Sequence, residues 1–87
     1  MGKPGRFAVI FEEAAAEFIL AQSKRWRRRL MDICYAIADD PFTEIGFVLK
    51  DADGRDISHI STEGYLVSYW TDAPVKRVVI VEIEELE

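Results

Sequence analysis

The chain has 87 residues, of which 49% are hydrophobic and 31% are charged, and its formal net charge is −5. This length is enough for one domain and too short for two, and the apolar content argues against wholesale disorder. The acidic balance argues against a general nucleic-acid-binding protein, because neutralising phosphates requires a surplus of lysine and arginine.

We therefore expect one domain over residues 1–87, with a short tail at 1–6 and an acidic end at 85–87. The apolar run Phe7–Phe11 is followed at once by two glutamates, so it is too short for a signal peptide or a membrane span. We expect a cytoplasmic location, no cofactor and no membrane contact. Cys34 is the only cysteine, so an internal disulfide is excluded, and we expect this residue to lie in the core.

The N-terminal half is predicted to form a strand followed by two helices. Phe7–Phe11 is short, apolar and rich in β-formers, which predicts a strand buried on both faces. Residues 12–22 contain strong helix formers with acidic residues in the first turn, which predicts a helix. Ser23 can cap a second helix, in which apolar positions 26, 30, 33, 34 and 37 share one face. Pro41 ends it, since proline disfavours helical backbone in the preceding residue.

The C-terminal half changes to short β-prone runs separated by turn formers, and it predicts strands at 56–60, 65–70 and 77–83. The run 47–50 is either a further strand or an extended connection. Alternation would place Val79, Val81 and Ile83 on one face of the last strand, and the acidic residues 82–87 are expected to leave the sheet edge for solvent. The prediction is an α+β fold, β-α-α-β-β-β with an optional extra strand, whose antiparallel-rich sheet is covered on one face by the helix pair.

The strongest charged feature is a run of cations at the start of the second predicted helix. Its members are Lys24, Arg25, Arg27, Arg28 and Arg29. Aligned guanidinium groups suit the recognition of phosphates or carboxylates, so this basic segment is a candidate anion-binding or partner-binding site. Its more ordinary interpretation is a solvated helix face balanced by acidic residues nearby. The candidates for that balance are Glu12, Glu13, Glu17 and Asp32.

Two further patterns are weaker. The carboxylates of Asp51, Asp53 and Asp56 around Gly54 resemble a calcium loop, but the glycine is misplaced and Thr62 stands where the final glutamate would be needed, so a tight turn is expected. The aromatic residues favour a core over a base-stacking platform, with Trp70 expected to show an exposed edge. These aromatics are Trp26, Tyr35, Tyr65, Tyr69 and Trp70.

The order of strand, two helices and strand meander, with Tyr65-Leu66-Val67-Ser68-Tyr69 near the C-terminus, resembles the RelE/ParE toxin superfamily. Supporting details are the Trp26–Leu30 opening of the second helix, Asp40-Pro41 at its end, and the final Val78–Ile83 strand. The resemblance covers roughly residues 7–84 and implies a bacterial type II toxin–antitoxin component of the plasmid-stabilisation kind. It also implies an antitoxin-like protein partner.

The same resemblance implies that the usual nuclease chemistry is missing. Nuclease members carry an arginine in the penultimate strand that stabilises charge developing on the scissile phosphate, and this chain has Leu66 at that position. Those members end in basic and aromatic residues, whereas this chain ends in an acidic stretch. The alternative is a residual site built from Arg55, His59, Tyr65 and Tyr69, with His59 as the group suited to proton transfer near neutrality.

Three functions stay open. The first is a toxin-like protein, or a descendant without catalysis, that acts by binding an antitoxin-like partner. The second is an active mRNA endonuclease or a gyrase-inhibiting toxin, although the acidic charge disfavours RNA or the ribosome as a target. The third is a small α+β dimerisation module unrelated to toxins, which would form a homodimer through an edge strand at Val78–Ile83.

Overall fold

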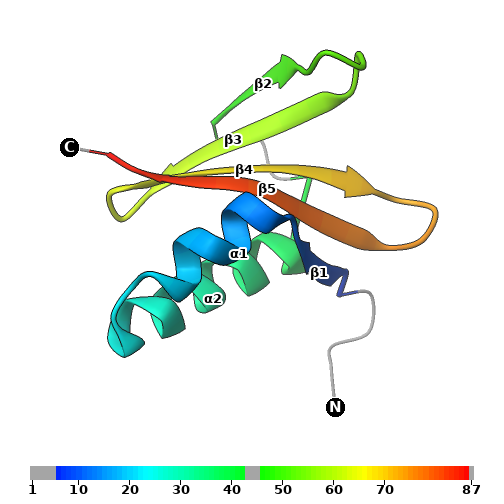
Figure 1. Cartoon of the computed structure of the whole chain (residues 1–87). Coiled ribbons are helices and arrows are strands. Elements are labelled where there is room, and N and C mark those ends of the chain that lie inside the picture. Colours follow the sequence, from blue (N-terminus) through cyan, green and yellow to red (C-terminus); the bar gives the residue numbers. More distant parts are fainter. Residues whose placement is uncertain (1–5, 43–45, 87) are drawn as a thin grey trace.

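A computed structural model describes residues 6–42 and 46–86, so most of the expected tail at residues 1–6 and Glu87 lie outside the described residues. Its elements in chain order are β1 (Ala8–Phe11), α1 (Glu13–Leu20), α2 (Lys24–Asp39), β2 (Phe47–Lys50), β3 (Asp56–Thr62), β4 (Tyr65–Asp72) and β5 (Arg77–Glu85). The strands form one sheet in the order β1-β5-β4-β3-β2, in which only β1 and β5 are parallel neighbours (Figure 1). The predicted α+β fold is confirmed, and the run Phe47–Lys50 is a strand.

Local signals in the sequence set both helices. The Ser23 hydroxyl accepts a hydrogen bond from the backbone N–H of Trp26 at 3.4 Å, as expected of a cap, and α2 ends at Asp39, two residues before Pro41. The buried positions of α2 are Leu30, Ile33, Cys34, Ile37 and Ala38. In α1, Ala15 and Ile19 are buried. The predicted helix pair is therefore confirmed, and so are positions 30, 33, 34 and 37 of the apolar face. Trp26, which was predicted to share that face, is 39% exposed in the first turn of α2.

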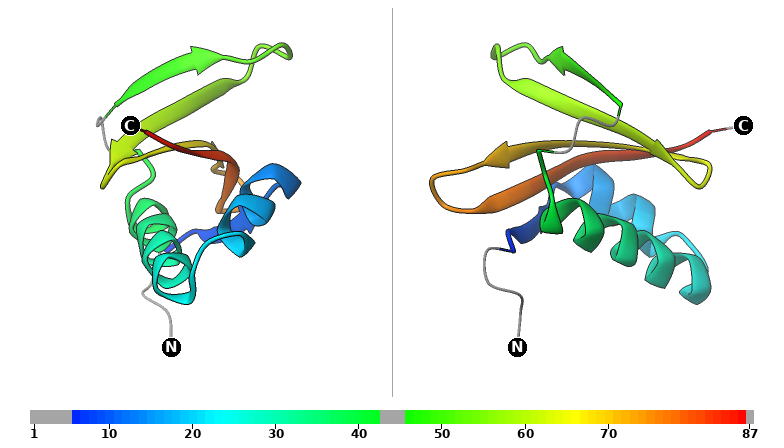
Figure 2. Two further views of the ribbon diagram at one scale, coloured as in Figure 1. Left: turned by 60° about the vertical axis from the view of Figure 1, so that its left-hand side comes forward. Right: turned by 180° about the vertical axis from the view of Figure 1, so that it is seen from behind.

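The molecule has two layers, with the helix pair packed on one face of the sheet (Figure 1). The helices contact β1 and β5, while β2 and β3 extend beyond them (Figure 2). The core between the layers contains Leu30, Cys34, Val67, Tyr69 and Ile80, each at most 1% exposed. The opposite sheet face, here called the open face, is not covered by either helix. Within the described residues, no helix is both long and apolar enough to cross a membrane.

The prediction that the first strand is buried on both faces is wrong. Strand β1 is an edge strand with one neighbour, β5, and only one of its faces meets the helices. Val9 and Phe11 on that face pack against the core, whereas Ala8 and Ile10 on the open face are exposed. A short apolar run does not reveal whether a strand is central or at an edge, because that depends on which strands pair with it.

Two predictions about the last strand are also wrong. Between Arg77 and Ile80 it lies between β1 and β4, so it is not the free edge expected for dimerisation. The acidic end does not leave the sheet, since Glu82, Glu84 and Glu85 all pair with β4. The backbone N–H of Leu86 continues this pairing with a hydrogen bond of 2.7 Å to the Gly64 carbonyl.

A β-bulge corrects the expected facing of the last strand. Tyr69 pairs with Ile80 and Ser68 pairs with Glu82, so Val81 is an extra residue without a counterpart in β4. The bulge shifts the alternation by one residue. Ile83 therefore joins Ile80 in the core instead of sharing a face with Val79, and Glu82 turns to the open face.

Candidate functional site

The open face of the sheet carries two adjacent rows of side chains. Pairing places Leu49 opposite Ile57, and it places Trp70, Val79 and Ile10 side by side. Continuing the β3–β4 register by one residue joins these two groups into an apolar row across the sheet. The next row consists of Phe47, His59, Ser68 and Glu82. Alternation of side chains along each strand brings these residues together from distant parts of the sequence.

His59 is held on both sides within its row. The Ser68 Oγ and the His59 Nδ1 share a hydrogen bond of 2.8 Å, and the Phe47 ring stacks on the imidazole with centroids 4.8 Å apart. Ser68 is only 5% exposed, so its hydroxyl serves as a partner for the ring and is poorly placed to attack a substrate. The sequence had indicated His59 alone. Ser68 and Phe47 could have been found by assuming the pairing of the three strands.

Arg55 and Trp70 form a second stacked pair on the open face. The guanidinium carbon lies 4.3 Å from the centre of the indole ring, a geometry that gives a cation–π attraction. Trp70 is half-buried, and its Nε1 is buried without a hydrogen-bond partner among the described residues. Arg55 and His59 therefore share the open face, but Arg55 is engaged with Trp70.

Leu66 stands on the open face at the position where the sequence resemblance places a catalytic arginine. Its cross-strand neighbours are Ser61 on β3 and Glu84 on β5. One row further, Glu82 lies opposite Ser68, and both glutamates are exposed. This end of the face therefore combines an apolar side chain with two carboxylates, which would repel a phosphate backbone.

The structure does not bring Tyr65 and Tyr69 into one site with Arg55 and His59. Both tyrosines point to the helix side, where they are 6% and 1% exposed. Tyr65 packs edge-on against Phe18, and the Tyr69 hydroxyl donates a hydrogen bond of 3.2 Å to the Pro41 carbonyl. Burial raises the pKa of Tyr69. The four residues are separated because the β3–β4 register places Ser68, and not Tyr69, opposite His59.

The basic segment occupies the first turns of α2, away from the open face. Lys24, Arg25 and Arg28 are exposed and Arg27 is half-buried, and none of the four makes an ion pair with another described residue. Beside them, a groove of about 270 Å³ lies against the β3–β4 turn. Its lining residues are Arg25, Trp26, Arg28, Arg29, Asp32 and Glu63.

Arg29 differs from the rest of the segment because it has a partner. Its Nε donates to the Glu63 Oε1 at 2.7 Å, and a second guanidinium nitrogen donates to the other carboxylate oxygen. This contact raises the pKa of Arg29 and lowers the pKa of Glu63. The acidic partner of the basic segment was expected on the first helix or at Asp32. Glu63 instead comes from the β3–β4 turn, and nothing in the sequence near Arg29 indicates this pairing.

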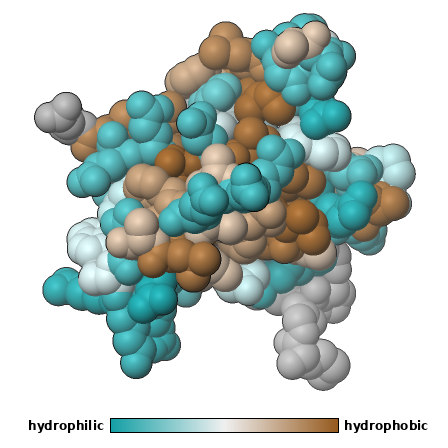
Figure 3. All heavy atoms as spheres, in the orientation of Figure 1, coloured by the Kyte–Doolittle hydropathy of each residue, from teal (hydrophilic) through white to brown (hydrophobic). Residues whose placement is uncertain are grey.

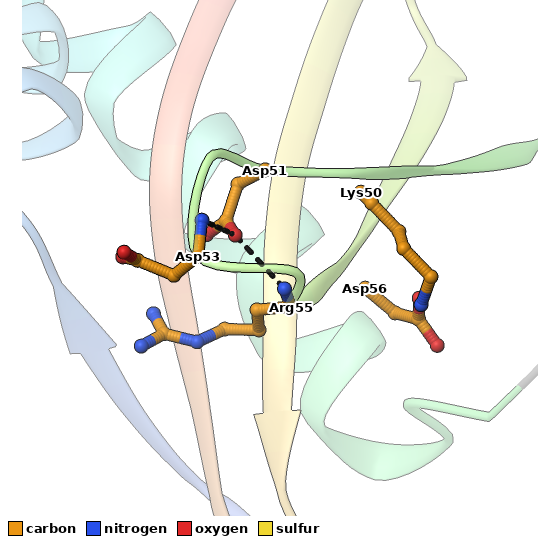
Figure 4. Close-up of polar contacts among 5 residues, drawn as sticks. All are labelled: Lys50, Asp51, Asp53, Arg55 and Asp56. Atoms are coloured by element: carbon orange, nitrogen blue, oxygen red, sulfur yellow. Dashed lines mark hydrogen bonds and ion pairs between the residues drawn. The ribbon is translucent and has the colours of Figure 1, made fainter.

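The aspartate-rich loop is a tight turn (Figure 4). The Asp51 Oδ1 accepts hydrogen bonds of 2.9 Å from the backbone N–H groups of Asp53 and Arg55, and Lys50 and Asp56 form an ion pair at 2.6 Å. The Asp51 carboxylate thus stabilises the turn itself. Among residues 6–42 and 46–86, no three His, Cys, Asp or Glu side chains are grouped so as to hold a metal ion.

Comparison with solved structures places this geometry among known folds. A toxin–antitoxin complex, RelBE2 of Mycobacterium tuberculosis, contains a chain that matches with a TM-score of 0.76 at 16% identity, covering 92% of this chain and 98% of that one. The isolated RelE toxin of E. coli matches with a TM-score of 0.73 at 17% identity, covering 93% and 85%. A YoeB/ParE toxin from Agrobacterium tumefaciens matches with a TM-score of 0.64 at 13% identity, covering 92% and 99%.

The chain has the RelE/ParE-like toxin fold. No protein-family model matches the sequence, and a search of curated proteins finds no match. Within the RelE/ParE-like fold, the sequence resemblance assigns the arginine position to β4, and here that position is Leu66 opposite Glu84. The fold itself carries no activity, so function has to be argued from these surfaces.

Proposed function

We propose that this protein is a toxin-like component of a type II toxin–antitoxin pair that acts by binding a protein partner and does not cut RNA by arginine-dependent chemistry. The partner would be an antitoxin-like protein encoded beside it. The RelE/ParE-like fold supports the first part of this proposal. Solved structures with that fold include toxin–antitoxin complexes from Mycobacterium tuberculosis, Pyrococcus horikoshii and E. coli.

The observation that carries the loss of nuclease chemistry is the pairing of Leu66 with Glu84 on the open face. Stabilising charge that develops on a phosphate requires a preorganised cation or hydrogen-bond donor. A leucine supplies neither, and a neighbouring carboxylate would act in the opposite sense. Glu82 adds a further negative charge one row away.

The basic segment is the surface that best suits a protein partner. Lys24, Arg25 and Arg28 are exposed without ion pairs to other described residues. Arg25 and Arg28 line a groove that Trp26 also lines. Clustered cations next to an aromatic edge favour an acidic stretch with apolar residues as the bound segment. The acidic remainder of the chain makes nucleic acid the weaker alternative, because RNA approaching the segment would also meet that charge.

The test is a binding measurement with the purified product of the adjacent small gene, using calorimetry on the full chain. We expect binding that weakens at least about tenfold in Arg28→Glu, since a favourable charge becomes a repulsive one. The matched control is Lys76→Glu, which reverses an exposed cation in the β4–β5 turn. Absence of binding, or equal loss in both variants, would overturn the proposal.

A growth assay separates this proposal from the endonuclease or gyrase alternative, which His59 and Arg55 on the open face still favour. Induced expression of the chain alone should leave growth unchanged. Growth arrest that is relieved by His59→Ala would instead establish an active toxin. The control is Ser61→Ala, an exposed open-face position that pairs with Leu66.

A further inference from the structure

Strand β2 is an exposed apolar edge. All of its residues are exposed, and Phe47, Val48 and Leu49 are 51%, 57% and 56% exposed. It is the last strand of the sheet, so the outer backbone groups have no neighbouring strand among the described residues. Figure 3 shows hydrophobic surface at the top of the molecule, where Figure 1 places β2.

Side chains on both faces of β2 are exposed to solvent. Phe47 and Leu49 lie on the open face, and Val48 lies on the helix side, where the helices do not reach (Figure 2). The only charge on the strand is Lys50, and its ammonium group is held by Asp56 at the hairpin end. Proteins usually protect an edge of this kind with charge, proline or a covering element. These three apolar residues have none of those protections.

The hydrogen bonds of the β2–β3 hairpin show which backbone groups face outward. The N–H of Asp51 donates to the Arg55 carbonyl at 2.9 Å, so these two residues form a hydrogen-bonded pair. Hydrogen-bonded and non-hydrogen-bonded pairs alternate along antiparallel strands. Leu49 and Phe47 therefore also direct their backbone groups toward β3, and Val48 directs its N–H and carbonyl outward.

We propose that β2 binds β2 of a second copy of this chain, in antiparallel orientation, with Val48 opposite Val48 of the second copy. The two copies are related by a twofold axis perpendicular to the sheet. In this register the outward N–H and carbonyl of each Val48 bond reciprocally. Phe47 lies opposite Leu49 of the second copy on the open face, and Lys50 lies opposite Gly46, which has no side chain. Each pair of directly opposed side chains in the two β2 strands is therefore apolar.

The edge is complementary to itself in this register and not in the neighbouring one. Two residues that lie opposite each other in the β2 pair must point to the same face of the sheet. The alternative registers therefore differ in which residue of β2 lies on the twofold axis. Centring the pair on Leu49 would place Val48 opposite Lys50 and Phe47 opposite Asp51. Centring it on Phe47 would place Val48 opposite Gly46, which has no side chain to contact. The centre at Val48 is therefore the register that opposes apolar side chains of β2 on both faces. This match favours a second copy over an unrelated strand as the occupant.

The first test is the molar mass of the full chain in solution, measured by sedimentation equilibrium over a range of concentrations. We expect a monomer–dimer equilibrium. Val48→Lys should weaken the dimer by at least roughly a hundredfold, because both valines of the central pair are lost and like charges meet at the axis. The control is Val75→Lys, since Val75 is 55% exposed in the β4–β5 turn and lies away from β2. A chain that stays monomeric at millimolar concentration would overturn the proposal.

The second test keeps the edge apolar and reads the register directly. Opposed residues in a strand pair lie within the Cα separation that a disulfide spans. Val48→Cys should therefore form a covalent dimer under mild oxidation, and Val75→Cys should not; native Cys34 is fully buried. Equal cross-linking in both variants would contradict the register. A second outcome would also contradict the proposal. If the wild-type chain is a monomer and Val48→Lys abolishes only the binding of the adjacent gene product, a different protein occupies the edge.

Discussion

The carboxylate of Glu63, in the β3–β4 turn, accepts two hydrogen bonds from the guanidinium of Arg29 in α2. This contact connects the β3–β4 turn of the sheet to α2, the helix that carries the basic segment. It also shapes the groove beside that segment, because both residues line it. One side chain of the cluster is thereby fixed by the fold, and its exposed neighbours stay available for a partner.

The Arg29–Glu63 contact should make stability depend on pH. The pKa of Glu63 is lowered in the folded state by its contact with Arg29. The contact therefore stabilises the fold at pH values above the unfolded-state pKa of about 4.3, and this stabilisation is lost as the pH falls through the folded-state pKa. We expect the melting temperature to fall less steeply between about pH 6 and about pH 3 in Glu63→Gln than in the wild type. The effect is small because both side chains are solvent-accessible. Glu17→Gln, at an exposed position without an ion pair to a described residue, should keep the wild-type profile.

Tyr69→Phe should destabilise the fold without altering partner binding. The substitution removes a hydroxyl that donates to the Pro41 carbonyl in the core, and losing such a bond costs about 1 kcal/mol. Urea denaturation would measure the difference in free energy of unfolding. Tyr35→Phe serves as the control, since that side chain is 41% exposed. An unchanged stability in Tyr69→Phe would show that this hydroxyl is not a structural group.

Gly46→Ala should be among the most damaging single changes. Gly46 has a φ of 96°, and a Cβ there would lie 1.9 Å from the backbone oxygen of His59. The start of β2 would have to move away from β3, and we expect a loss of at least about 2 kcal/mol in the free energy of unfolding. Gly54→Ala is the matched control, because Gly54 has a φ of 79° but open space around it, so only the backbone strain of about 1–2 kcal/mol applies. Equal losses in the two variants would contradict the close approach.

His59 and Ser68 should behave as a coupled pair. A double-mutant cycle with His59→Ala and Ser68→Ala isolates their interaction, and we expect a coupling free energy of about 0.5–1.5 kcal/mol for the 2.8 Å hydrogen bond. Additive losses in urea denaturation would indicate that the two side chains are independent. A second cycle with His59→Ala and Ser61→Ala serves as the control. The hydrogen bond of His59 is to Ser68, so the losses in this second cycle should be additive.

Cys34 should be chemically inert in the folded protein. Burial raises the pKa of its thiol to about 12, and the side chain is fully buried in α2. Iodoacetamide at about pH 8 should modify it only after unfolding, because the thiolate is the reactive form. Mass spectrometry would detect the modification. Rapid modification of Cys34 under native conditions would contradict this packing.

The features that the sequence could predict are those that local physics determines. Ser23 caps α2 and Pro41 follows its end because both signals act within one turn of the helix. The helix pair, the strand meander and the apolar face of α2 followed from spacing alone. Element order then led to the same fold that the solved structures have.

The features that it could not predict depend on which strands become neighbours. Nothing near Ile10 indicates that one face of β1 lacks a covering layer. The grouping of Tyr69 with His59 failed for the same reason, since the choice of face follows from a register between β3 and β4. Glu63 could not be assigned to Arg29 without knowing that their elements meet. The cytoplasmic location stays a prediction.

The bulge at Val81 has a consequence for how relatives of this chain should be compared. Beyond Ile80 regular pairing would have directed Glu82 and Glu84 toward Val67 and the helices, where unpaired carboxylates could not be buried. One surplus residue turns both carboxylates outward and directs Ile83 inward. A homologue that lacks a residue here would recover ordinary alternation with the same side chains inward, so a one-residue gap at position 81 is compatible with the fold. A gap at Val79, on the other side of Ile80, would disturb the pairing with β1 as well.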